Sequence, residues 1–263
     1  MAATDLHVEA QGSGPVVVLA HGFAGSARNW RPQVRALRDR YRVVTTDARG
    51  HARSPAPDVA AAYRQDALVG DLAAVVEEAS GAAPAVVGGL SMGAAVALLL
   101  ALARPERVRA LVLASLPAGS RSGQDIAARA ERFAEAIERE GIEAAGARFA
   151  WGPESGLDPA GAALVRQGFL EHPPHGLVHT LRELLASWPS VEALAPRLAS
   201  VQIPTLVVAG TADRASLGPC RELAKALPAA ELEEIPGAGH VVNLAAPAAF
   251  NAALRRFLEG LPA

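Results

Sequence analysis

Residues 89–93 read Gly-Leu-Ser-Met-Gly, and this stretch decides the fold of the 263-residue chain. It stands between two apolar runs, residues 85–88 and 94–103, which predict a buried strand and a buried helix. A G-x-S-x-G turn from strand to helix puts its central residue in a strained backbone conformation, with the hydroxyl held at the start of the helix. The helix N-terminus stabilises negative charge that develops there. Ser91 is therefore a candidate nucleophile, although a glycine-rich turn with a capping serine would have the same sequence.

Two more predicted strands are followed by polar residues that could complete such a site. The run at residues 205–209 predicts a buried strand, and Asp213 follows it. A strand near residues 231–235 is followed by a glycine-rich turn that ends at His240. Serine, aspartate and histidine thus each follow a predicted strand, in that chain order.

This chain order is that of the α/β-hydrolase fold. Over nearly its whole length the chain resembles small-cap α/β-hydrolases of the esterase and enol-lactone hydrolase type. Besides the serine turn, the matching stretches are residues 12–15, 21–23, 47–54, 105–108 and 237–240. Several independent motifs in the right order and spacing argue against coincidence.

The resemblance implies a catalytic triad of Ser91, Asp213 and His240. His240 would take the proton of Ser91 during attack, and Asp213 would fix the imidazole tautomer. The backbone N–H groups of Phe23 and Met92 would form the oxyanion hole, because they follow the His-Gly turn and the nucleophile respectively. The side chains expected to line the substrate pocket are those of Phe23, Trp30, Met92, Trp151, Trp188 and Val241, with core packing as the ordinary alternative for the tryptophans.

Several conspicuous polar residues favour structural interpretations. His21 is expected to organise the oxyanion loop by hydrogen bonding rather than to transfer protons. The polar side chains of residues 47–54 are expected to form a hydrogen-bond network rather than a second acid–base cluster. His175 and His179 would share one helix face, but Gly176 occupies the place of the glutamate found in zinc-binding H-E-x-x-H sites. We therefore expect neither a metal nor a cofactor.

Alternating strand and helix signals predict an α/β architecture with a mostly parallel sheet flanked by helices. Residues 6–10 predict an antiparallel edge strand, and further strands are expected near residues 16–20, 43–46, 85–88, 110–114, 205–209 and 231–235. Residues 1–117 and 196–263 are predicted to form the core domain. Residues 118–195 contain no convincing strand pattern and are predicted to form a cap inserted before the strand that precedes Asp213, with helices near residues 124–140, 142–150, 160–170 and 176–187.

Composition limits the classes of function. The formal net charge is −2 without any basic block, so neither a nucleic-acid nor an anionic membrane partner is expected. The single cysteine, Cys220, excludes an internal disulfide, and the first ten residues lack the pattern of a signal peptide. We expect a cytoplasmic protein with a small-molecule partner. The sequence does not distinguish a monomer from a homodimer.

The predicted function is hydrolysis of a carboxylic ester or lactone with a small to medium, fairly apolar substrate, through an acyl-enzyme on Ser91. Leu90 argues against the carbon–carbon bond hydrolases that this fold also includes, which usually carry asparagine there. A serine at position 91 argues against epoxide hydrolase and dehalogenase chemistry, which uses aspartate. A perhydrolase resembling cofactor-free haloperoxidases, an acyltransferase, and a receptor that retains the triad remain alternatives.

Overall fold

The computed structural model describes residues 5–117, 124–152 and 159–262 of the chain. Its centre is a seven-stranded sheet in the order β1-β3-β2-β4-β5-β6-β7. Only β1 is antiparallel, pairing with β3, and all other pairs are parallel. The strands are β1 (Val8–Gln11), β2 (Val16–Ala20), β3 (Arg42–Thr46), β4 (Ala85–Leu90), β5 (Val108–Ala114), β6 (Thr205–Gly210) and β7 (Ala230–Ile235). The sheet confirms the predicted fold class.

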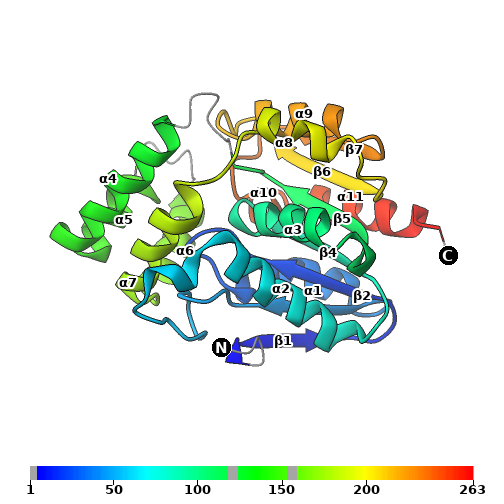
Figure 1. Cartoon of the computed structure of the whole chain (residues 1–263), viewed down its shortest axis with the longest axis horizontal. Helices are drawn as coiled ribbons and strands as arrows, with labels where there is room; N and C mark the ends of the chain where they lie inside the picture. The colour runs from blue at the N-terminus through cyan, green and yellow to red at the C-terminus, as the bar shows by residue number, and fades with distance from the viewer. Residues whose placement is uncertain (1–4, 118–123, 153–158, 263) are drawn as a thin grey trace.

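Helices cover both faces of the sheet, as expected for parallel strands that are apolar on both sides. One face is covered by α2 (Gln65–Ser80), α3 (Met92–Ala103), α8 (Val191–Leu198) and α9 (Leu217–Ala226), whose apolar side chains share one buried cluster. The other face is covered by α1 (Arg31–Leu37), α10 (Val242–Ala245) and α11 (Pro247–Gly260). Every residue of β4 and β6 is buried. Figure 1 shows these layers.

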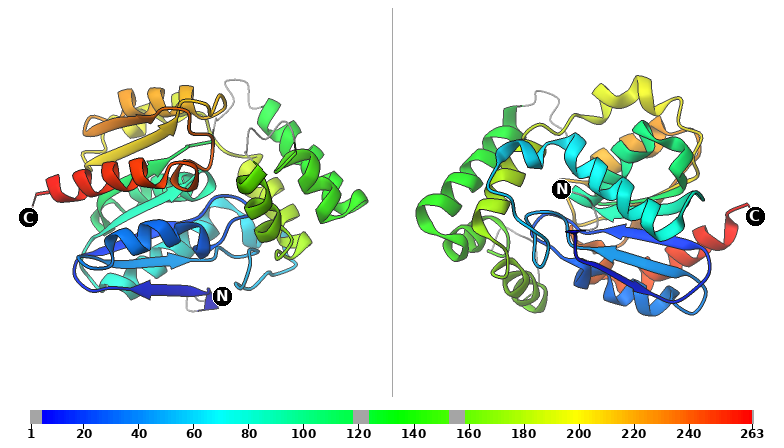
Figure 2. Two further views of the ribbon diagram at one scale, coloured as in Figure 1. Left: turned by 180° about the vertical axis from the view of Figure 1, so that it is seen from behind. Right: turned by 60° about the horizontal axis from the view of Figure 1, so that its bottom comes forward.

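Between β5 and β6, the regular elements of the described residues are helices. They form α4 (Gln124–Glu140), α5 (Ile142–Phe149), α6 (Pro159–Phe169), α7 (Pro174–His179) and a π-helix (Thr180–Leu185), followed by α8. The helices α4 to α7 stand together beyond one end of the sheet (Figures 1 and 2). They have their own apolar cluster, which includes Phe133, Phe169 and Leu177.

The division into a core and a cap is a proposal. Its first boundary, at residue 118, lies outside the described residues. Its second boundary, between residues 195 and 196, falls inside α8, which packs with α9 in the cluster on the face of the sheet. We propose that α4 to α7 form the cap. In the part of the chain that the structure describes, none of the helices has the length and apolar character needed to cross a membrane.

Candidate active site

Ser91 occupies the tight turn between β4 and α3. Its backbone has φ +51° and ψ −112°, a conformation that is strained for a residue with a side chain. The turn requires glycine on both sides, because a Cβ atom on Gly89 would overlap the backbone of Gly93, and one on Gly93 would overlap the backbone of Ala20. The Ser91 amide donates to the carbonyl oxygen of Ala114 at 2.8 Å. Its side chain forms no capping hydrogen bond with α3, so the hydroxyl is available for chemistry.

Asp213 and His240 form a hydrogen-bonded pair. Asp213 follows β6 and His240 follows β7, and Nδ1 of His240 donates to Oδ2 of Asp213 at 2.8 Å. The Asp213 side chain is buried, whereas the imidazole is 39% exposed. Burial raises the pKa of Asp213, but hydrogen bonds from His240 and Ser216 outweigh this effect and hold that pKa below its ordinary value. The carboxylate is therefore ionised at neutral pH and can stabilise an imidazolium.

The pair and the serine lie at the same edge of the sheet, because β4, β6 and β7 run parallel and each residue follows the carboxyl end of its strand. The hydrogen bonds of the described residues do not include one between Ser91 Oγ and the His240 ring. Catalytic hydrogen bonds are often long when no substrate is bound. The contact between Ser91 and His240 is therefore part of our proposal.

The expected oxyanion loop follows β2, which pairs directly with β4. At Gly22 the chain passes close to the serine turn, since a Cβ there would lie 3.5 Å from the Cβ of Ser91. His21 holds this loop in place: Nδ1 donates to the Gly22 carbonyl oxygen at 2.7 Å, and Nε2 accepts the Ala48 amide at 2.9 Å. Burial lowers the pKa of His21 to about 4. His21 is thus a neutral residue with both nitrogens engaged, as structural organisation requires.

The polar residues after β3 form a hydrogen-bond network around Asp47. One carboxylate oxygen of Asp47 accepts the Ala27 amide at 2.7 Å, and the other accepts Nε of Arg53 at 2.8 Å. Arg49 forms a buried, bidentate ion pair with Asp71 of α2. These hydrogen bonds fix the loop to its neighbours. Asp47 and Arg49 thus have structural partners, as the predicted hydrogen-bond network requires.

Three buried histidines form a cluster between this loop and the cap. The ring centroid of His51 lies 5.2 Å from those of His21 and His172. His51 Nδ1 donates to the Arg49 carbonyl oxygen at 3.1 Å, and His172 Nδ1 accepts the Ala52 amide at 2.7 Å. Burial is the main cause that lowers the pKa of both His51 and His172. We call His21, His51 and His172 the histidine cluster. All three rings are neutral at pH 7.

The other cap histidines also contact loops of the core. His175 Nε2 lies 2.9 Å from the Ala56 carbonyl oxygen, and His179 Nε2 lies 3.1 Å from Oδ1 of Asp58. They therefore face separate partners rather than a shared ligand. Within the described ranges, no group of three or more His, Cys, Asp or Glu side chains is arranged to hold a metal ion.

Two of the expected pocket residues, Phe23 and Trp151, pack against the apolar cluster of the cap. Phe23 is half-buried, and its ring meets those of Phe133 and Phe169 edge-on at 5.8 and 6.5 Å. Trp151 is also half-buried and lies 5.2 Å from Phe169. The Phe23 side chain thus joins the loop after β2 to the buried aromatic cluster of the cap. Val241 is half-buried beside His240 and packs against the core cluster behind it.

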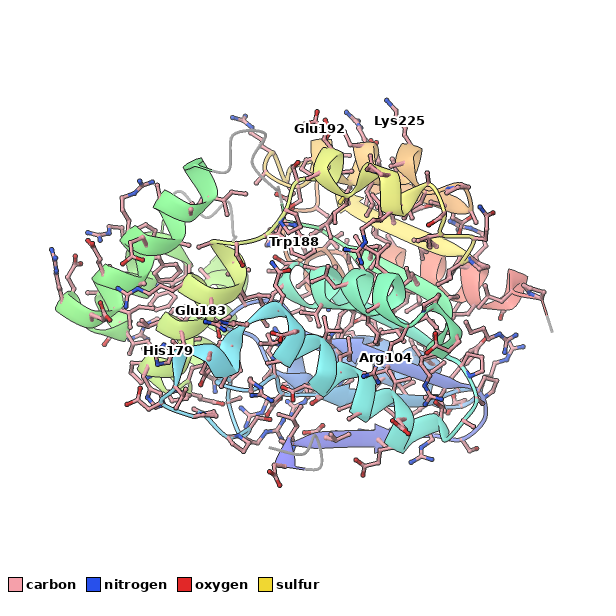
Figure 3. All side chains as sticks on the ribbon, in the orientation of Figure 1. Arg104, His179, Glu183, Trp188, Glu192 and Lys225 are labelled. Atoms are coloured by element: carbon pink, nitrogen blue, oxygen red, sulfur yellow. The ribbon has the colours of Figure 1, made fainter. Side chains whose placement is uncertain are left out.

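The structure places the other three expected pocket side chains in the core. Trp30 is completely buried 6.0 Å from Phe250, because it faces α11 rather than the open end of the sheet. Met92 is 1% exposed, since the first turn of α3 points its side chain inward. Trp188, labelled in Figure 3, is buried in the same cluster as the side chains of α3. Their burial favours core packing for these three side chains, and their place in the substrate pocket stays a prediction, as does the role of the Met92 amide as an oxyanion donor.

Comparisons with known proteins identify the family. Residues 17–253 match the family model described as "Alpha/beta hydrolase family", so the chain belongs to this family. It is 31% identical to epoxide hydrolase A of Mycobacterium tuberculosis, over 94% of this chain and 91% of that protein. Its structure resembles a thermophilic esterase from Thermogutta terrifontis, with a TM-score of 0.85, 28% identity, and coverage of 97% of this chain and 93% of that one.

The structure also resembles the enol-lactonase from Burkholderia xenovorans LB400, with a TM-score of 0.81 and 26% identity over 97% of this chain and 96% of that one. These relatives support hydrolase activity for the chain. Because they act on different bonds, the reaction itself must be argued from the residues at the site.

Proposed function

We propose that this protein is a serine hydrolase that cleaves a carboxylic ester or lactone. The observation that carries the proposal is the buried Asp213 carboxylate bonded to Nδ1 of His240, at the sheet edge where the strained turn presents Ser91. With Nδ1 occupied by Asp213, Nε2 is the nitrogen left to accept the serine proton. This division of roles is what nucleophilic catalysis by serine requires.

In the proposed reaction, Ser91 Oγ forms a bond to the acyl carbon while its proton passes to Nε2 of His240. The carbonyl oxygen becomes an oxyanion, which the amides of Phe23 and Met92 would stabilise by about 3 kcal/mol each. His240 then gives the proton to the leaving oxygen as the ester bond breaks. Water attacks the acyl-enzyme by the same route, with His240 again accepting the proton and returning it to Ser91.

The nature of residue 91 distinguishes ester cleavage from epoxide opening. Epoxide hydrolases of this fold use an aspartate at the nucleophile position, where this chain has Ser91. The resemblance to an esterase and an enol-lactonase supports the ester and lactone chemistry. The half-buried side chains of Phe23 and Trp151, at the edge of the apolar cluster of the cap, support a small to medium, fairly apolar substrate.

The proposal also concerns the setting of the reaction. We propose a cytoplasmic enzyme with a small-molecule substrate. The single cysteine, Cys220, is buried and has no second thiol in the chain, so the fold does not depend on an internal disulfide.

The test is hydrolysis of p-nitrophenyl acetate, butyrate and octanoate by wild type and Ser91→Ala, with fluorophosphonate labelling in parallel. We expect labelling at Ser91, turnover with wild type and its loss in the variant. Ser200→Ala, which changes an exposed serine, serves as the control. Labelling without repeated turnover would favour a receptor over an enzyme, and failure of both would refute the triad.

A further inference from the structure

Ser216 stands at the N-cap position of α9, but its side chain forms no capping hydrogen bond. A serine at this position ordinarily accepts a hydrogen bond from an amide of the first helical turn. Here the Oγ atom lies 3.2 Å from Nδ1 of His240 instead. The residue is only 1% exposed, so water does not compete for this contact. The Ser216 hydroxyl therefore contacts His240 and does not cap α9.

Ser216 also contacts the carboxylate that holds the same nitrogen. Its amide donates to Oδ1 of Asp213 at 3.2 Å, while Oδ2 of Asp213 accepts Nδ1–H of His240 at 2.8 Å. Against the effect of burial, the hydrogen bonds from His240 and then those from Ser216 lower the pKa of Asp213. Ser216, Asp213 and His240 thus form a closed triangle on the side of the imidazole away from Nε2.

We propose that Ser216 is a positioning residue for His240, whose hydroxyl acts with Asp213 to keep the proton on Nδ1. A hydroxyl carries one donor and two acceptor sites, so Ser216 can donate to the Asp213 carboxylate and accept from Nδ1–H at the same time. This inference rests on the proposed function, in which Nε2 must be unprotonated to accept the proton of Ser91. Nδ1 keeps its proton throughout the reaction.

The contribution of Ser216 should be larger in the transition state than in the resting enzyme. When Nε2 accepts the serine proton, the imidazole becomes positively charged, and hydrogen bonds from a charged donor are stronger than those from a neutral one. An interaction that strengthens in the transition state affects kcat, whereas one that is equal in both states affects KM. Loss of the hydroxyl should therefore lower kcat and leave KM close to the wild-type value.

The kinetic test compares Ser216→Ala, Ser216→Thr and the matched control Ser190→Ala. Ser190 is a true N-cap, since its side chain accepts the Ala193 amide of α8 at 3.1 Å. We expect Ser216→Ala to lower kcat about tenfold, the loss typical of a hydrogen bond to a charged group, and to move the acidic limb of the pH–rate profile to lower pH. Ser216→Thr, which keeps the hydroxyl, should have the kcat and the acidic limb of the wild type.

The control separates positioning from helix capping. Ser190→Ala should lower the midpoint of thermal unfolding and leave kcat and the pH–rate profile unchanged. If Ser216→Ala behaves like Ser190→Ala, with a stability loss and no kinetic change, the proposal is overturned. It is also overturned if Ser216→Thr is folded like the wild type but as slow as Ser216→Ala.

A measurement without substrate separates this inference from the proposed function. Nitrogen-15 NMR reports which nitrogen of His240 carries the proton, with His240→Gln used to assign the signals. We expect the Nδ1–H tautomer in wild type, partial retention in Asp213→Ala, and loss of the preference in Asp213→Ala combined with Ser216→Ala. Equal tautomer populations in the last two variants would overturn the role of Ser216. This result is obtained whether or not the protein hydrolyses esters, so failure of the ester assay would count against the proposed function only.

Discussion

Mild acid should destabilise this protein through its histidine cluster. The pKa of His21 is about 4 in the folded protein and about 6.5 in an unfolded chain. Below pH 6.5 the unfolded state therefore binds a proton that the folded state does not, and stability falls as the pH falls. Above that pH both states are neutral at this residue, so its contribution to stability is fully present.

The size of the effect follows from the two pKa values. Between pH 7 and pH 5, His21 alone should lower the free energy of unfolding by about 2 kcal/mol. His51 and His172 act in the same direction, because burial lowers their pKa values too. Paired carboxylates such as Asp47 also have lowered pKa values. The stability that they contribute is lost only when the pH falls below about 4, the ordinary pKa of an aspartate. The interval from pH 7 to 5 thus isolates the histidines.

The assay is urea unfolding of wild type, His21→Gln and His175→Gln at pH 7, 6 and 5, with the slope m compared at each pH. We expect His21→Gln to be less stable at pH 7 but to lose about 2 kcal/mol less on acidification. His175→Gln changes an exposed histidine and should keep the wild-type loss. A free energy of unfolding that stays constant from pH 7 to 5 would refute the neutral buried state of these rings.

Two other substitutions test the site and its support. Asp213→Asn should leave the far-ultraviolet circular dichroism unchanged and lower kcat about 10⁴-fold, because an amide favours the wrong imidazole tautomer; near-normal turnover would place the acid elsewhere. Asp71→Asn should destabilise the protein by about 3 kcal/mol in urea unfolding at pH 7, because Arg49 keeps its charge at a site where its side chain is only 9% exposed. Glu259→Gln, which removes the exposed partner of Arg40, should change stability by less than about 1 kcal/mol, and an equal loss in both variants would contradict the argument from burial.

The sheet and its serine turn could be predicted because their signals are local. The apolar run at residues 94–103 predicted a buried helix after Ser91, and α3 (Met92–Ala103) contains this run. In contrast, α8 was not predicted. Its eight residues are few, and Pro196 lies inside it, which is unfavourable for a helix interior. The signal in the sequence that could have predicted the start of α8 is Ser190, because its side chain caps the first turn.

Other parts of the site depend on contacts that no local pattern encodes. The ring of His172 meets Ala52, which is 120 positions away in the chain. Trp30 and Met92 were expected near substrate because of their place beside the motifs, but the direction of a side chain depends on which helix packs against it. Ser216 follows Asp213 by three residues, so the sequence places it near the carboxylate. Only the geometry of the turn shows that its hydroxyl faces His240.

The helix α7 has contacts on two sides, with the helices α4 to α6 and with loops of the core. Its Leu177 and Val178 pack with the apolar cluster of α4, whereas His175 and His179 contact loops of the core. A helix fixed on both sides transmits the position of one part to the other. In protein engineering, grafts that replace α4 and α5 should therefore keep α7, because it carries the contacts of the cap with residues 56 and 58 of the core.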